Sequence, residues 1–283
     1  MSEFRTELGL NIFKNKYAQN QYETWADRAH IVVDAVAGTN GGTETALLTK
    51  EERDQLVEYL VDFKWLPGGR YLWYAGRKAR FYNNCYLLKA EEDSREEWAD
   101  LWKRAGSCLM TGGGIGIDVS AFRPKGRTLS KTGGVSSGPI PFLLATNEIG
   151  RNVMQGGSRR SAMYGSMNWQ HEDAQDFLKI KNWTPEQKAA KEADFNAPAP
   201  LDMMNVSLNY DDAWLKDKNN PVFLENVKQA MMTGEPGFSF NFGDKQNETL
   251  RNACCEVVSE DDSDVCNLSS VNMSRIESVE EFK

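Results

Sequence analysis

The sequence predicts an α/β fold in which parallel strands are separated by helices. From residue 80 onward, segments rich in aromatic and aliphatic residues alternate with segments whose apolar residues recur at helical spacing. A glycine-rich stretch at residues 111–116 joins a helix directly to a strand. Strands connected through helices form parallel sheets or barrels, and the loops at the strand ends carry function.

The N-terminal quarter is expected to be helical. Residues 22–36 and 51–63 place apolar side chains at helical spacing. Thr49 followed three residues later by Glu52 has the pattern of a capping box, which marks the start of the second helix. The sequence Pro67-Gly68-Gly69 ends this helical region.

The remaining elements alternate in type along the chain. Strands are expected at residues 80–88, 161–167, 203–208 and 237–242, with another directly after the glycine loop in the run 111–118, and helices at 94–110, 139–154, 172–181 and 222–232. Residues 182–200 are polar and are expected to be irregular. Near the C-terminus, Ser278 begins a capping pattern just before Lys283 ends the chain, so we expect a fragment or one half of a split protein.

Composition and charge narrow the class of protein. The 283 residues are 40% hydrophobic and 26% charged, which is typical of a globular protein. The net charge of −8 argues against direct nucleic-acid binding. No apolar run approaches the roughly 18 residues of a membrane span, and no signal peptide is recognised. We therefore expect a cytoplasmic protein without a membrane partner.

Histidine and cysteine usage limits the chemistry. The chain has two histidines, neither in a metalloprotease pattern, and five cysteines without a C-x-x-C pair, so no metal site is predicted. Cys108 lies in an apolar stretch and is expected to be a core residue. The run of residues 252–256 (NACCE), followed by Cys266, instead gathers thiols, an amide and a carboxylate in a short segment. This constellation is the strongest candidate for a reactive site.

The glycine loops match no standard phosphate motif. Residues 112–116 lack the third glycine of a dinucleotide-binding loop, and residues 133–138 are followed by Pro139 where a P-loop requires lysine. Glycines at 112–116 would let the backbone come close to a ligand, and a tight turn without a ligand is the alternative.

Several segments, in the same order along the chain, resemble the catalytic subunit of ribonucleotide reductases. They are residues 84–85 (NC), 113–117 (GGIGI), 137–142 (SGPIPF), 156–160 (GGSRR), 252–256 (NACCE) and 266–272 (CNLSSVN). The resemblance implies a ten-stranded α/β barrel of two five-stranded halves, with a radical cysteine on a finger loop between them. Residues 1–75 would be a helical N-terminal region. Residues 76–283 would be a partial barrel, comprising the first half-barrel, the finger loop and the start of the second half.

The same resemblance implies a thiyl-radical reaction. Cys254 would become the radical that abstracts the ribose 3′ hydrogen, Glu256 would accept the 3′-hydroxyl proton, and Asn252 would bind the substrate hydroxyls. A carboxylate close to the radical thiol is suited to general base catalysis. The product would be a 2′-deoxyribonucleotide.

Reducing equivalents would come from a cysteine pair. By the resemblance, Cys85 and Cys266 form a dithiol that leaves as a disulfide and is reduced again by a thioredoxin-like partner. Their Cα atoms would then lie within roughly 4.4 to 6.8 Å of each other. Asn84, Gly113 and Gly114 are expected substrate contacts. The complementary C-terminal half of the enzyme would be needed, so the chain alone is expected to be inactive.

An allosteric site is also implied. Asp93, Ser94 and Arg123 correspond to positions where a deoxynucleotide effector binds in the family. The alternative interpretation is that they belong to ordinary surface loops.

Within the family, the adenosylcobalamin-dependent class II enzymes are the best match. The short spacing between Cys254 and Cys266 and the absence of an ATP-cone sequence favour this class, with adenosylcobalamin (coenzyme B12) as cofactor. Residues 65–73 (WLPGGRYLW) resemble the monomeric, triphosphate-reducing branch. Two alternatives remain: a class I large subunit with a separate radical-generating protein, and a non-catalytic nucleotide-binding module of the same fold.

One residue departs from the family pattern. Cys255 follows the proposed radical cysteine, where the family usually has glycine. We expect its side chain to point into the core, with radical trapping or an off-pathway disulfide as the alternative.

Overall fold

The computed structural model describes residues 4–37, 48–153 and 161–282, and the chain divides into two compact units. Unit 1 comprises Met1–Asn84 and Asn267–Lys283, and unit 2 comprises Cys85–Cys266. The boundary expected from the sequence, after residue 75, lies earlier than the observed division. The motif at residues 156–160 lies outside the described residues.

Unit 1 consists of short helices and one small sheet around an aromatic core. Trp25 and Phe63 stack in this core with ring centroids 4.9 Å apart. The predicted capping box of Thr49 and Glu52 is present. The elements are α1 (Glu7–Ile12), the π-helix η1 (Phe13–Tyr17), α2 (Trp25–Ala37), α3 (Lys50–Val61), β1 (Trp65–Pro67), α4 (Gly69–Tyr74), β10 (Ser269–Val271), the 3₁₀ helix η3 (Met273–Arg275) and α11 (Val279–Phe282), with β1 and β10 antiparallel.

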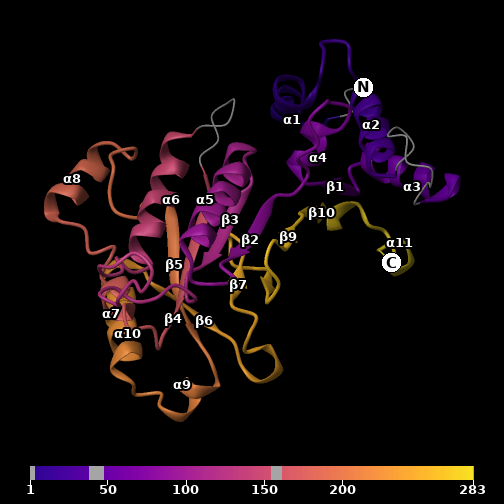
Figure 1. The fold of residues 1–283 in the computed structure, drawn as a ribbon. Coiled ribbons are helices and arrows are strands. Elements are labelled where there is room, and N and C mark those ends of the chain that lie inside the picture. The colour runs from indigo at the N-terminus through magenta and orange to yellow at the C-terminus, as the bar shows by residue number, and fades with distance from the viewer. Residues whose placement is uncertain (1–3, 38–47, 154–160, 283) are drawn as a thin grey trace. The chain divides into compact units, whose positions relative to one another are not determined.

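A six-stranded mixed sheet forms the centre of unit 2, in the order β6-β5-β4-β3-β2-β9 (Figure 1). The strands are β2 (Cys85–Lys89), β3 (Gly114–Asp118), β4 (Met163–Asn168), β5 (Met204–Tyr210), β6 (Gly237–Phe240) and β9 (Val265–Cys266). Strands β2 to β6 are parallel, and β9 runs antiparallel to β2. The predicted α/β class is therefore confirmed.

Helices connect the parallel strands of unit 2. They are α5 (Arg95–Met110), α6 (Ile140–Asn152), α7 (Ala174–Leu178), α8 (Pro185–Ala193), α9 (Asp212–Lys216) and α10 (Pro221–Thr233), and the 3₁₀ helix η2 (Gly243–Lys245) follows β6. Ser94 caps α5 by accepting a hydrogen bond from the backbone N–H of Glu97 at 3.1 Å. Helices α5 and α6 pack against each other, and their apolar residues join the strands in one hydrophobic core.

The sheet of unit 2 has one apolar and one polar face, because successive side chains of a strand point to opposite sides. Ile115, Ile117 and Met163 belong to the large hydrophobic core that the helices cover. The intervening residues are small or polar. They define what we call the polar face: Gly114, Gly116, Asp118, Tyr164, Ser166, Ser207, Asn209 and Ser239.

Two sequence-based boundaries were wrong. Strand β2 begins at Cys85 rather than at residue 80, so the residues before it belong to unit 1. Residues 182–200, expected to be irregular, contain the helix α8. Thr184 and Gln187 form a capping box there, with Pro185 in the first turn. That signal is present in the sequence, but the polar composition of the segment obscured it.

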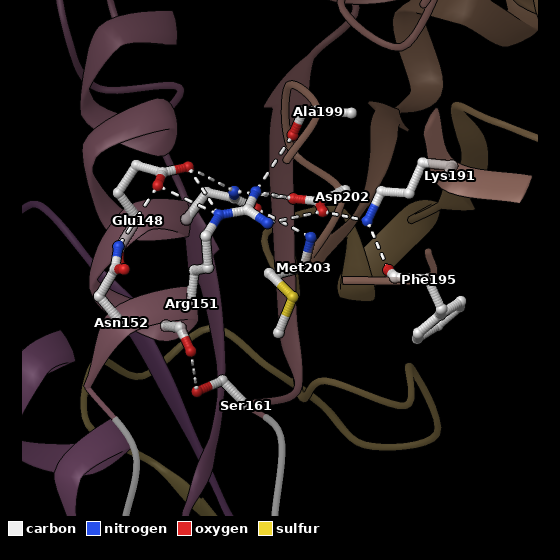
Figure 2. Close-up of polar contacts among 11 residues, drawn as sticks. Glu148, Arg151, Asn152, Ser161, Lys191, Phe195, Ala199, Asp202 and Met203 are labelled. Atoms are coloured by element: carbon white, nitrogen blue, oxygen red, sulfur yellow. Dashed lines mark hydrogen bonds and ion pairs between the residues drawn. The ribbon is translucent and has the colours of Figure 1, made fainter. Parts of the chain in front are cut away.

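A network of charged groups joins α6 to the segment that carries α8. Figure 2 shows Arg151 reaching the Asp202 carboxylate, which Lys191 approaches from another side. The distances are 2.9 Å from Arg151 Nη1 and 2.5 Å from Lys191 Nζ to Asp202 Oδ2. Asn147 donates to the same carboxylate at 3.2 Å. The Asp202 side chain is only 1% exposed, so these contacts compensate a buried charge.

Candidate active site

The segment 252–257 forms the tip of a short antiparallel hairpin. Its arms are β7 (Leu250–Arg251) and β8 (Val258–Ser259), and we call residues 250–259 the tip hairpin. Asn252 closes the tip, because its Oδ1 accepts a hydrogen bond from the Val257 N–H at 3.0 Å. The Asn252 carbonyl accepts another from the Cys255 N–H, also at 3.0 Å. The side chain and backbone of one asparagine thus fix the turn that carries Cys254.

The tip hairpin lies directly on the glycines of β3. A Cβ atom at Gly116 would stand 1.6 Å from the backbone oxygen of Arg251, and one at Gly114 would stand 3.0 Å from the Cβ of Ala253. Glycine was expected at these positions to allow the close approach of a ligand or a tight turn. The structure instead uses it for the close approach of another segment of the same chain.

Cys85 and Cys266 face each other across β2 and β9. They are register partners in this antiparallel pair, and they are 7% and 3% exposed. Opposed residues of antiparallel strands have Cα atoms about 4.5 to 5.5 Å apart, which is within the range of disulfides. The predicted pairing of the two cysteines in space is confirmed. Both are thiols in this structure.

Asn252 and Glu256 both reach the Cys266 thiol. Asn252, which is fully buried, donates from Nδ2 to Cys266 Sγ at 3.6 Å, and the thiol lies 3.9 Å from Glu256 Oε1 as a donor. Burial, and then the neighbouring Cys85, Glu256 and Cys254, raise the pKa of Cys266 to about 11. The sulfur therefore carries its proton near neutral pH. Glu256 itself is exposed.

Cys254 and Cys255 are both exposed at the tip of the hairpin. The expectation that Cys255 points into the core was wrong. Its φ angle of 70° lies in the left-handed region, which favours glycine because a Cβ atom is strained there. The turn that presents Cys254 therefore requires a backbone conformation that Cys255 adopts at a cost.

Two polar residues that the sequence analysis did not single out anchor the hairpin. Thr249 donates from its hydroxyl to Asp118 Oδ2 at 2.5 Å. Arg251 donates from Nε to Ser239 Oγ at 2.7 Å and from Nη2 to Asn241 Oδ1 at 2.8 Å. Asp118 is 7% exposed, and burial raises its pKa. A carboxylate that ends an apolar strand was the available sequence signal for Asp118.

The expected effector residues also lie together. Arg123 and Asp93 form an ion pair, and Arg123 Nη2 donates to the Asp93 backbone oxygen at 3.2 Å. Ser94, the next residue, caps α5. The three residues are thus neighbours at the start of one helix, and their role in binding an effector stays a prediction.

The expected substrate contacts have different surroundings. Asn84 belongs to unit 1, where its Oδ1 accepts a hydrogen bond from the Leu268 N–H at 3.3 Å. Gly113 packs under the ring of Tyr86, since an added Cβ would lie 2.6 Å from that ring. Gly114 lies beside Cys85 and Ala253. Substrate binding by these three residues stays a prediction.

Comparisons with known proteins agree on one family. The sequence model described as "Ribonucleotide reductase, barrel domain" matches residues 83–235. A vitamin B12-dependent ribonucleoside-diphosphate reductase from Thermoplasma acidophilum is 27% identical over 243 residues, covering 78% of this chain and 31% of that protein. A ribonucleoside-diphosphate reductase large subunit from Danio rerio is 33% identical over 157 residues, covering 54% of this chain and 20% of that protein.

A solved structure supports the fold. The class Id ribonucleotide reductase alpha subunit of Actinobacillus ureae matches with a TM-score of 0.70 and 19% identity, over 95% of this chain and 49% of that one. The chain spans a third or less of the length of the two curated relatives described above. Within the described ranges, no helix has the length and apolar character needed to cross a bilayer.

Proposed function

The chain belongs to the family of the ribonucleotide reductase barrel domain, and from this premise we propose that it supplies the radical cysteine and the reducing dithiol for the conversion of ribonucleotides to 2′-deoxyribonucleotides. The observation that carries the proposal is the pairing of Cys85 with Cys266 beside a tip that bears Asn252, Cys254 and Glu256. Sulfur, amide and carboxylate groups thus meet at the amino end of strands β2 and β3, where Cys85 is paired with Gly114.

The reaction assigns a different task to each group. A thiyl radical at Cys254 removes the 3′ hydrogen atom of the ribose and returns one at the end of the cycle. Glu256 is exposed at the tip and takes the proton of the 3′-hydroxyl. Asn252 is the proposed ligand of the ribose hydroxyls, and its amide also contacts Cys266.

The cysteine pair balances the reduction. Cys85 and Cys266 together give up two hydrogen atoms and form a disulfide, while the 2′-hydroxyl of the substrate leaves as water. The raised pKa of Cys266 keeps that hydrogen on sulfur until the reaction takes it. A thioredoxin-like dithiol partner then reduces the disulfide by exchange.

Adenosylcobalamin is the proposed cofactor. Relatives from Thermoplasma acidophilum and Mycobacterium tuberculosis are named vitamin B12-dependent enzymes, which supports this choice. When bound, adenosylcobalamin supplies an initiating radical by homolysis of its cobalt–carbon bond. The exposed thiol of Cys254 fits this chemistry, because an external initiator has to reach it. His171 offers no lone pair to cobalt, since its ring nitrogens are engaged by the Phe122 oxygen and the Asp173 N–H.

A class I large subunit is the second candidate. The Danio rerio relative, at 33% identity, carries the large-subunit name, which favours a separate radical-generating protein. The two candidates also raise the question of whether the substrate is a ribonucleoside diphosphate or triphosphate. The segment 65–73 favours triphosphates, whereas the curated relatives are named diphosphate reductases.

One experiment tests the function and separates these candidates. The chain, combined with the complementary C-terminal half of a class II relative, is assayed with ribonucleoside di- and triphosphates and dithiothreitol. Adenosylcobalamin is added in one series and a metal-containing radical subunit in the other. We expect deoxynucleotide with adenosylcobalamin, and none from a Cys254→Ser variant. Product that depends on the metal subunit would favour the class I candidate. Product that persists without Cys254 would contradict the radical role.

The proposed effector site is tested by measuring how deoxynucleotides change substrate preference. A deoxynucleoside triphosphate at the Asp93 and Arg123 pair would change which ribonucleotide the enzyme prefers. We expect an Arg123→Ala variant to lose that response while it keeps basal turnover. Substrate preference that never responds to deoxynucleotides would remove the effector site.

A further inference from the structure

Two side-chain anchors fix the tip hairpin to the polar face of the sheet. We propose that the pair Thr249–Asp118 and the group Arg251–Ser239–Asn241 are positioning elements that set where Cys254 stands relative to Cys85 and Cys266. The role of this positioning in catalysis rests on the proposed function. The positions of the three thiols relative to one another can be tested without it.

The first anchor is the Asp118 carboxylate, in which each oxygen accepts two hydrogen bonds. Oδ2 of Asp118 accepts hydrogen bonds from Thr249 Oγ1 at 2.5 Å and from Asn209 Nδ2 at 3.3 Å. Oδ1 accepts from the Ser120 N–H at 2.9 Å and also from the Ser120 hydroxyl. These donors come from β5, from the turn just after β3 and from the chain just before the hairpin. Because Asp118 is held from several sides, it presents a fixed acceptor to Thr249.

The second anchor is a forked guanidinium contact. Arg251 uses Nε and Nη2 for separate bonds to Ser239 and Asn241, which are themselves joined at 3.3 Å. Ser239 and Asn241 are 2% and 5% exposed. Among the described residues, no carboxylate lies within ion-pair distance of Arg251. The guanidinium therefore contributes directed hydrogen bonds and orientation rather than charge neutralisation.

The two anchors act on Thr249, directly before the hairpin, and on Arg251 in its first arm, where the backbone also contacts β3. Thr249 and Arg251 are two residues apart, so in an extended arm their side chains lie on the same side. The carbonyl of Arg251 rests where Gly116 lacks a side chain, and Ala253 rests on Gly114. The arm is thereby held at β3 and at β6 at once. If the arm shifted along the sheet, the hydrogen bonds of Thr249 and Arg251 would break. The Arg251 carbonyl would then meet the side chains that flank Gly116 in β3.

The placement matters because the reacting thiol lies at the exposed tip of the hairpin. Cys254 and Glu256 are exposed, and Asn252 holds the turn that carries them. A displacement of about 1 Å at a reacting group is sufficient to cost roughly 100-fold in rate. The anchors below the tip therefore determine the position of the radical thiol.

Cross-linking in the 283-residue chain tests the proposal without turnover. In a Cys85→Ser/Cys255→Ser background, a short bis-methanethiosulfonate links Cys254 to Cys266, and peptide mapping quantifies the link. We expect Thr249→Val and Arg251→Met each to lower this yield about fivefold, the effect of losing one hydrogen bond of ordinary strength. Thr249→Ser, which keeps the hydroxyl, restores the yield. Thr233→Val is the matched control, because its half-buried hydroxyl donates to the carbonyls of Gln229 and Glu235 and accepts from the Glu235 N–H, all at the C-terminal end of α10 and not on the hairpin.

A second readout separates positioning from general damage. In the chain with its native cysteines, diamide oxidation of Cys85 and Cys266 reports the integrity of β2 and β9. We expect this disulfide to form equally in all the variants. Unchanged Cys254 cross-linking in both anchor variants would overturn the proposal, and so would an equal loss of both products. If the cross-linking yields change as expected but no deoxynucleotide forms in the assembled enzyme, the positioning role of the anchors is supported and the proposed function is wrong.

Discussion

Cys85 and Cys266 lie opposite each other at the two points where the chain passes between its units. Cys85 is the first residue of unit 2 and Cys266 is the last, and the register of β2 and β9 pairs them. The first and last residues of unit 2, which are distant in sequence, are therefore paired in neighbouring strands. A dithiol at such a position is held by backbone pairing and needs no disulfide to stay together.

Oxidation should join this pair selectively. With one equivalent of diamide, we expect one intramolecular disulfide between Cys85 and Cys266, because these thiols share a register and the antiparallel Cα spacing suits a disulfide. Peptide mapping under non-reducing conditions identifies the product. Cys266→Ser should abolish it, and Cys108→Ser, which alters a half-buried cysteine packed against the main core, should leave it unchanged. A dominant Cys254–Cys255 product would contradict the expectation.

The ionisation of Cys266 should occur well above the usual range. Burial, together with Cys85, Glu256 and Cys254, raises its pKa to about 11 from the ordinary 9.0. Because the folded chain favours the neutral thiol, this group's contribution to stability is complete below pH 9.0 and is lost as the pH rises through about 11. Thiolate absorbance, taken as the difference between the chain and Cys266→Ser, measures the midpoint. A midpoint near 9 would count against the burial of this sulfur.

Glu256 should contribute to that shift. Its carboxylate disfavours the thiolate and accepts the thiol hydrogen. Glu256→Gln removes the charge, so we expect the midpoint of Cys266 to move to lower pH. Glu260→Gln is the matched control, since Glu260 is an exposed carboxylate after β8 that does not act on this thiol. Equal midpoints in the two variants would exclude the proposed influence of Glu256.

Glycine should be the better residue at position 255. A side chain at φ 70° costs about 1 kcal/mol, which glycine avoids. We expect Cys255→Gly to unfold at higher urea concentration than Cys255→Ala, which removes the thiol but keeps the Cβ. Turnover of the assembled enzyme should survive both changes. A large loss of turnover in both variants would mean that the Cys255 thiol takes part in the reaction.

Gly116 and Gly106 should respond in opposite directions to alanine. Gly116→Ala would place a Cβ 1.6 Å from the Arg251 oxygen, and such overpacking costs about 1 to 3 kcal/mol. Gly106 lies within α5 and has no atom within 4 Å of its added Cβ, so Gly106→Ala should stabilise the helix by about 0.8 kcal/mol. Urea unfolding of both variants measures the difference. Two changes of the same sign would contradict the described packing of the hairpin on β3.

The Asp202 network should make unit 2 sensitive to acid. Burial acts to raise the pKa of Asp202, but its contacts with Arg151 and Lys191 outweigh burial and hold the pKa below the ordinary value. The stability that this carboxylate provides is therefore present above pH 3.8 and lost as the pH falls through its lowered pKa. Asp202→Asn should cost about 3 kcal/mol at pH 7 and flatten the acid limb of an unfolding profile.

Glu148 provides the control for that experiment. It also contacts Arg151, at 3.1 Å, but its side chain is 55% exposed. Exposed ion pairs contribute about 0 to 1 kcal/mol, so Glu148→Gln should leave the acid profile nearly unchanged. Equal losses in the two variants would contradict the role of the buried carboxylate (Figure 2).

The sequence predicted those features that depend on local pattern. Alternation of strands and helices gave the parallel sheet, and the crowding of Asn252, Cys254 and Glu256 identified the tip. The pairing of Cys85 with Cys266 required the family resemblance, because spacing alone does not fix which strands become neighbours.

The anchors of the hairpin had no local signal. Thr249 meets Asp118, and Arg251 meets Ser239, only because the hairpin folds back over β3 and β6. The conformation of Cys255 was also hidden, since a cysteine gives no indication of a left-handed turn. Such features depend on tertiary contacts, which no window of the sequence contains.

The absence of a side chain at Gly116 also limits which amino acids this position can accept during sequence divergence. Every other amino acid brings a Cβ into the space that the Arg251 carbonyl occupies. A saturation library at this codon should therefore lose stability at every substitution, whereas libraries at the exposed neighbours of the tip should accept many residues. Divergence around the candidate site should therefore begin at the exposed tip rather than at Gly116 beneath it.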